Sequence, residues 1–100
     1  MRAATAAVLE RIREAEMNGW QTYTYLYTAH PDKHMHALGV DAPEVGAIVQ
    51  GIDTELCRLW DELSAASSDV ALVVTADHGH VTVTSDEMVA LPPSVLCTLE

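Results

Sequence analysis

Hydrophobic and polar positions follow two different periods along the chain, and these periods predict the secondary structure. Residues 3–17 and 41–64 carry apolar side chains at three- and four-residue steps, the spacing of one face of an α-helix. Residues 20–28 alternate and are rich in Thr and Tyr, which is typical of a strand. Residues 70–75 form a continuous Val-rich run, the pattern of a strand covered on both faces. The chain is therefore expected to form helix, strand, helix and strand in this order.

The second predicted helix has the clearest start signals. Asp41 is expected to cap it, Glu44 three residues later can complete a capping box, and Pro43 suits the first turn. The first helix is expected to stop at residues 18–19, Asn-Gly, because glycine readily takes the left-handed conformation that ends helices. Residues 29–40 contain Pro and Gly and are expected to form a long loop.

The order strand, helix, strand describes a βαβ unit with a right-handed crossover, so both strands would run in the same direction. The predicted fold class is therefore α/β, with residues 1–100 as a single partial α/β domain and residues 81–84 as a short further strand. Its open sheet edges would invite self-association. The expected core is Leu26, Val45, Ile48, Val49, Ile52, Leu56, Leu59, Leu63, Leu72, Val73 and Val74.

Composition excludes several classes of partner. A formal net charge of -10 argues against binding nucleic acid through phosphate contacts. No stretch approaches the roughly 20 apolar residues that span a membrane. The N-terminal residues lack the apolar core of a signal peptide, so a cytoplasmic location is the expectation for this chain. Cys57 and Cys97 are expected to be buried or half-buried free thiols.

Candidate chemistry follows the ends of the two main predicted strands. Asp32 and His36 lie in the loop after the first strand, and Asp77 and His78 follow the second directly. Because neighbouring parallel strands lie about 4.8 Å apart and open on one edge, all four side chains would face one space. Each pair alone is compatible with a solvated loop or a polar turn, but together they match zinc or manganese ligands. A single tetrahedral site would use all four, whereas a two-metal site would divide them and need further ligands.

Two short segments resemble the motifs of one enzyme family. Residues 31–39, Pro-Asp-Lys-His-Met-His-Ala-Leu-Gly, resemble the Pro-Asp-x-x-x-His-x-x-Gly motif of type I phosphodiesterase/nucleotide pyrophosphatases, which belong to the alkaline phosphatase superfamily. Residues 75–80, Thr-Ala-Asp-His-Gly-His, resemble the family's Thr-(Ser/Ala)-Asp-His-Gly-(Met/His) motif. The resemblance extends over roughly residues 20–83. Cofactor-independent phosphoglycerate mutases and phosphopentomutases carry similar motifs and are the alternative within the superfamily.

The resemblance implies a three-layer α/β/α fold with a mostly parallel sheet and hydrolysis of a small phosphodiester or nucleotide substrate. It also implies two divalent metal ions, zinc first and manganese as the alternative. By position, Asp32 and His36 would bind the metal that activates the attacking water, and Asp77 and His78 the metal beside the nucleophile. Two ions about 3.5–4 Å apart stabilise both the entering and the leaving oxygen in such reactions.

The resemblance also implies that part of the active site lies outside this chain. The family's Thr or Ser nucleophile and a further Asp precede these motifs, and a third metal-binding His follows them. Thr75 is no substitute nucleophile, because it falls in a predicted buried strand. His30 stands where many relatives have Glu, while His34 and His80 are expected to support the site or face solvent. The chain is therefore expected to be a fragment of a larger hydrolase, without a catalytic nucleophile and inactive alone.

Two other interpretations stay open at this point. The chain is then either an inactive truncated fragment that binds zinc weakly or not at all, or an unrelated acidic α/β module. Such a module would bind a partner through the exposed face of the 41–64 helix, which carries Glu44, Gln50, Glu55 and Arg58.

Overall fold

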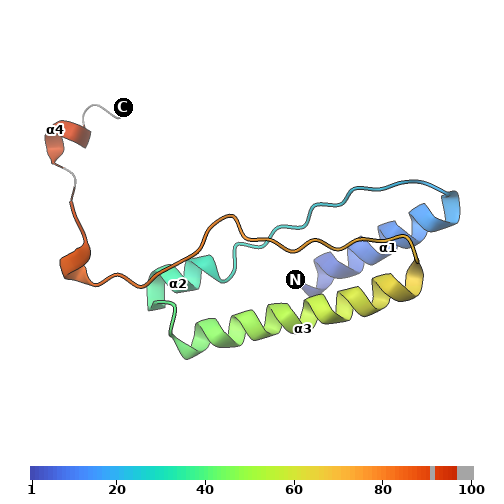
Figure 1. Ribbon diagram of the computed structural model, residues 1–100, viewed down its shortest axis with the longest axis horizontal. Helices are drawn as coiled ribbons and strands as arrows, with labels where there is room; N and C mark the ends of the chain where they lie inside the picture. The colour runs from blue at the N-terminus through green and yellow to red at the C-terminus, as the bar shows by residue number, and fades with distance from the viewer. Residues whose placement is uncertain (91, 97–100) are drawn as a thin grey trace.

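The computed structural model describes residues 1–90 and 92–96, and its main features are three helices joined by extended segments (Figure 1). The elements in order are α1 Arg2–Asn18, α2 Asp32–Leu38, α3 Pro43–Ala66, a 3-10 turn η1 Ser85–Glu87, and α4 Pro93–Leu96. The helices predicted at 3–17 and 41–64 are confirmed as α1 and α3, with ends shifted by one or two residues.

The ends of α1 and α3 agree with some of the predicted helix start and stop residues and not with others. Gly19 takes a left-handed conformation with φ +67°, and its N–H and that of Trp20 bond back to the last turn of α1, as the Asn-Gly stop predicts. At α3, Pro43 occupies the first turn as expected. The predicted cap at Asp41 is wrong, because Ala42 occupies the cap position and no side chain caps the helix.

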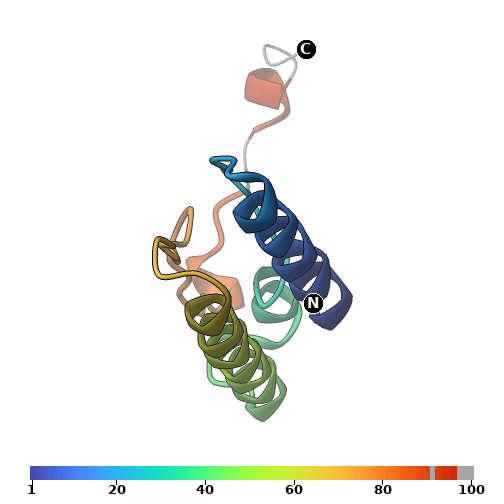
Figure 2. The same cartoon turned by 90° about the vertical axis from the view of Figure 1, so that its right-hand side faces the viewer.

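The packed part of the molecule is the contact between α1 and α3, which lie side by side in both views (Figures 1 and 2). Leu9 of α1 and Leu59 and Leu63 of α3 are buried against each other. Four partly buried apolar residues pack around them, namely Val8, Ile12, Val70 and Leu72. Burial of apolar surface between the two helices is thus the main source of stability in the described part of the chain.

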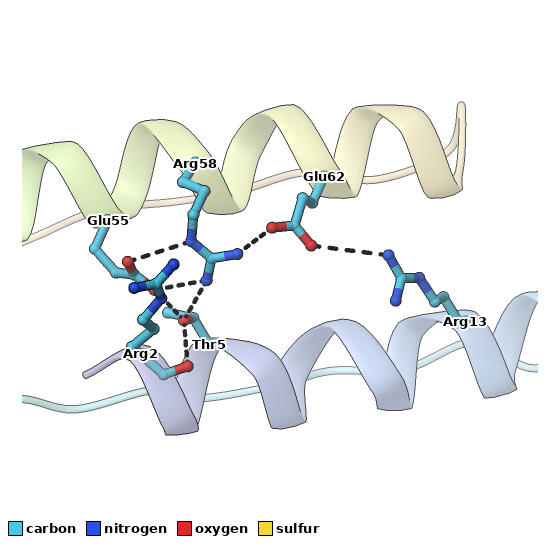
Figure 3. Close-up of polar contacts among 6 residues, drawn as sticks. All are labelled: Arg2, Thr5, Arg13, Glu55, Arg58 and Glu62. Atoms are coloured by element: carbon cyan, nitrogen blue, oxygen red, sulfur yellow. Dashed lines mark hydrogen bonds and ion pairs between the residues drawn. The ribbon is translucent and has the colours of Figure 1, made fainter.

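A network of polar side chains runs along the same contact (Figure 3). Thr5 has no exposed surface; its hydroxyl donates to the Glu55 carboxylate and accepts from Arg58 Nη2 at 3.0 Å. Arg58 also donates to Glu55 Oε1 at 2.6 Å and to Glu62, whose other oxygen lies 3.8 Å from Arg13 Nη2. Hydrogen bonds from Arg58 and then Thr5 lower the pKa of Glu55 from 4.5 to about 2. Every charge in this network has an internal partner.

The α/β prediction is wrong, because the described residues contain no strand and therefore no parallel sheet or three-layer α/β/α arrangement. Residues 20–28, 70–75 and 81–84 run without helical structure, but no backbone ladder joins them, and the expected βαβ crossover is absent. Tyr23 is 93% exposed and Val73 is 83% exposed. Alternating or Val-rich sequence indicates a segment suited to a sheet, but a strand forms only when another segment satisfies its backbone groups.

The core is also placed differently from the prediction. Among the expected core residues, only Val45, Leu59 and Leu63 are fully buried, whereas Val49 is 48% exposed. The reason is that α3 packs against α1 rather than beneath a sheet, so one narrow stripe of α3 is covered.

Two expectations about the surface have different outcomes. Cys57 is a free thiol as expected, but it is exposed rather than buried, while Cys97 lies outside the described residues. Within the part of the chain that the structure describes, no helix combines the length and the apolar character needed to cross a membrane.

Candidate metal centre

A short helix stands where the sequence predicts only a long loop. Asp32 is the first residue of α2, and His36 follows one turn later on the same face of the helix. His36 Nε2 lies 3.5 Å from Asp32 Oδ1. The Asp-x-x-x-His spacing thus brings a carboxylate and an imidazole together through helical geometry.

The segment after the Val-rich run lies against the end of α2. The backbone N–H of Val40 donates a hydrogen bond to Thr82 Oγ1 at 3.0 Å. Upstream of this contact, His78 Nε2 and His80 Nδ1 each lie 3.7 Å from Asp32 Oδ1. Two parts of the chain that are far apart in sequence therefore meet around one carboxylate oxygen.

Gly39 makes this close approach possible. Its φ of +83° with ψ of 161° is a backbone conformation that essentially only glycine adopts. A Cβ atom at this position would lie 3.2 Å from Thr82 Oγ1. The glycine that ends α2 therefore also leaves room for the segment that carries His78 and His80.

Asp32 Oδ1 is the centre of the cluster. This oxygen is buried, and among the described residues it has no hydrogen-bond partner. One ligand atom each from Asp32, His36 and His80 lie within 4.8 Å of one another, and the rings of His36 and His80 meet edge to face. A buried carboxylate oxygen without a partner is costly, and a divalent cation among the three groups would remove that cost. The donor set of one carboxylate and imidazole nitrogens fits zinc or manganese.

A backbone contact sets the orientation of His78. Its Nδ1 lies 2.7 Å from the Gly79 carbonyl oxygen, which can only accept, so in the neutral ring Nδ1 carries the proton. Nε2 is then the free nitrogen, and it is the one near Asp32. The hydrogen bond to Gly79 and then the charge of Asp77 raise the pKa of His78; burial lowers it by less than either, and the charge of Asp32 adds the smallest upward contribution.

Among the four residues proposed from sequence, Asp77 lies apart from the cluster. Its side chain is 81% exposed, Oδ1 accepts the backbone N–H of His78, and the same oxygen lies 3.9 Å from His78 Nε2. His80 lies in the cluster instead, although the sequence interpretation gave it a supporting or exposed position. The signal that identifies His80 is its spacing, because residues two apart in an extended segment point to the same side.

The other residues considered from sequence lie elsewhere. Thr75, expected in a buried strand, is exposed. His30 and His34 face each other, with their Nδ1 atoms 3.3 Å apart, and neither is a member of the cluster around Asp32.

Comparisons with known proteins identify the relatives of this chain. A family model described as "Type I phosphodiesterase / nucleotide pyrophosphatase" matches residues 2–93. The human (Homo sapiens) protein "Ectonucleotide pyrophosphatase/phosphodiesterase family member 5" is 32% identical over an alignment of 68 residues that covers 66% of this chain and 14% of that protein. The aligned part thus spans 14% of the length of this relative. No solved structure shows a significant match to the chain.

Proposed function

Because the chain belongs to the type I phosphodiesterase / nucleotide pyrophosphatase family, as the two sequence motifs predict, we propose that it carries part of a metal-dependent phosphodiesterase centre. Asp32, His36 and His80 hold one divalent ion, for which zinc is the first choice and manganese the second. The substrate is a small phosphodiester or a nucleotide. The nucleophile and the remaining ligands come from parts of a longer protein, in line with the length of the human relative.

The single observation that carries this proposal is the state of Asp32 Oδ1. This oxygen is shielded from solvent, yet three imidazole nitrogens surround it at 3.5–3.7 Å, just beyond hydrogen-bonding distance. With ligand bonds of about 2.0–2.1 Å, neighbouring ligand atoms of a tetrahedral zinc ion lie about 3.3–3.4 Å apart. The distances from Asp32 Oδ1 to the nitrogens of His36 and His80 are therefore closer to those of a ligand shell than to those of a hydrogen-bonded network.

Each residue has a distinct task in this proposal. Asp32 supplies negative charge, and His36 and His80 supply neutral nitrogen donors, which bind a cation only when deprotonated. When bound, the ion acts as a Lewis acid on a phosphoryl oxygen and lowers the pKa of a bound water. His78, oriented by the Gly79 carbonyl, lies beside this position. Asp77 and His78 together are the proposed ligands of a second ion, since Asp77 Oδ1 and His78 Nε2 lie 3.9 Å apart.

Calorimetric titration of the full chain with zinc chloride tests the site. Asp32→Asn keeps the shape of the side chain and removes its charge, so zinc affinity should fall by about tenfold or more, or about 1.4 kcal/mol. Asp53→Asn makes the same chemical change on the exposed surface of α3 and should leave the affinity unchanged. Equal zinc affinity in the Asp32→Asn variant and the unmodified chain would contradict the proposed site.

A hydrolysis assay tests the second half of the proposal. The chain supplemented with zinc should not turn over bis-nitrophenyl phosphate, because the proposed centre lacks its nucleophile. If turnover is measured and Asp77→Ala abolishes it, the chain is a complete enzyme and the fragment proposal is wrong.

A further inference from the structure

His30 and His34 form a second pair of facing imidazoles that the proposed phosphodiesterase centre does not use. Their Nδ1 atoms lie 3.3 Å apart, their ring centroids 5.0 Å apart, and the rings are tilted by 46°. Two nitrogens that bind one tetrahedral zinc ion at about 2.0–2.1 Å lie about 3.3–3.4 Å from each other. The pair already has the separation of two zinc ligands.

The helix keeps this pair apart from the cluster around Asp32. Each helical residue turns the side chain by about 100°, so positions two apart point in nearly opposite directions. Asp32 and His36 are four apart and share one face of α2, whereas His34 lies halfway between them in sequence and points away from both. The spacing His30-x-Asp32-x-His34-x-His36 therefore distributes possible ligands between two sides.

The pair also borders a cavity. A cavity of about 300 Å³ is lined by His30 and His34 together with Thr28, Ile48, Gly51, Ile52 and Met1. The N–H of His30 donates to Thr28 Oγ1 at 3.2 Å, which fixes the backbone that carries this ring. Two protein nitrogens fill half of a tetrahedral shell, and the cavity leaves space for water or a small anionic donor at the remaining positions.

We propose that His30 and His34 form a second divalent cation site, of a different type from the centre around Asp32. This site is selective for the class of borderline ions that imidazole prefers, namely zinc, nickel and copper. The site is open, with exogenous donors entering from the cavity. It is independent of the centre around Asp32, because the two sites share no ligand and His34 lies on a different face of α2 from Asp32 and His36. The high negative charge of the chain favours any bound cation.

The histidine content of the chain allows a clean test. The sequence has five histidines, so the triple variant His36→Gln/His78→Gln/His80→Gln leaves only His30 and His34. Nuclear magnetic resonance of the imidazole signals during titration with zinc chloride then reports on this pair alone. Both remaining rings should shift together and saturate at one ion per chain.

Two further variants complete the test. Adding His34→Gln to the triple variant should weaken zinc binding at the remaining ring by about tenfold or more, since one imidazole alone is a poor site. Adding Lys33→Gln, at the exposed neighbouring position, should leave the titration unchanged. The proposal is overturned if the triple variant shows no zinc-dependent shift of either ring, the result expected when a hydrogen bond alone holds the two rings together. Retained circular dichroism of the helices identifies which variants are folded.

Discussion

The contact between α1 and α3 and the contact between α2 and residues 78–82 both gather polar side chains from distant parts of the chain. In the first, Thr5, Glu55 and Arg58 satisfy one another through hydrogen bonds inside the protein. In the second, Asp32 Oδ1 is buried with three imidazoles nearby and no hydrogen bond among the described residues. A network whose polar atoms are all hydrogen-bonded stabilises a fold. A cluster of metal-binding side chains in which a buried polar atom lacks a partner is instead an expected place for a ligand.

The largest loss of unfolding free energy is expected from Leu59→Ala, which disturbs the contact between α1 and α3. Leu59 is 2% exposed at the centre of the α1–α3 contact, and removing a buried leucine side chain typically costs about 2–5 kcal/mol. The unfolding free energy from urea titration followed by circular dichroism measures the loss. Val49→Ala on the same helix is the control, because its side chain is 48% exposed and its loss should stay below about 1 kcal/mol. Equal costs for the two variants would contradict the packed contact.

An intermediate effect is expected from Gly39→Ala, which disturbs the other contact. The φ of +83° at Gly39 disfavours any side chain, and the new Cβ would lie 3.2 Å from Thr82 Oγ1, so the cost should be about 1–3 kcal/mol. Zinc affinity should fall as well, because the segment with His78 and His80 would be displaced.

Gly46→Ala is the matched control for that substitution. Gly46 lies inside α3 with nothing within 4 Å of an added Cβ, so alanine should stabilise the helix by about 0.5–1 kcal/mol. Similar effects of both substitutions on zinc affinity would argue against a specific role for Gly39.

The smallest expected effect is the pH dependence from Glu55. Its folded-state pKa of about 2 lies below the ordinary 4.5, so the unfolded chain takes up the proton first as the pH falls. The stabilisation is present above pH 4.5 and is lost progressively between about 4.5 and 2. Urea titrations across this range should show a weaker pH dependence for Glu55→Gln than for Glu10→Gln, which changes an exposed residue of α1. If the unfolding free energies of the two variants depend on pH in the same way, the lowered pKa of Glu55 is contradicted.

The sequence predicts the helices better than it predicts the extended parts. Helical spacing and the Asn-Gly stop depend on local interactions, and α1 and α3 lie within two residues of their predicted ranges. A strand depends on a partner segment, and nothing local in residues 70–75 indicates whether one is present. The α2 helix was missed because its seven residues lie between a proline and a glycine, which together favour a loop interpretation.

The candidate site illustrates a different limit of sequence reasoning. The sequence interpretation expected Asp32 and His36 near His78 because parallel strands would open on one edge. In the structure these residues do lie near one another, although its described part contains no such strands. The α2 helix and the hydrogen bond between Val40 and Thr82 bring them together instead. His80 and the exposed position of Asp77 could not be derived from a sheet, because they depend on how this segment crosses α2.

The hydrogen bond from Val40 to Thr82 anchors the segment that carries His78 and His80, so the number of residues between His80 and Thr82 determines which way the two imidazoles point. His78, His80 and Thr82 occur at alternate positions, so in an extended chain their side chains share one side. Inserting a single residue between His80 and Thr82 would rotate both imidazoles away from α2, whereas inserting two would bring them back. Tolerance to insertions at this point should therefore follow the parity of the added residues rather than their number.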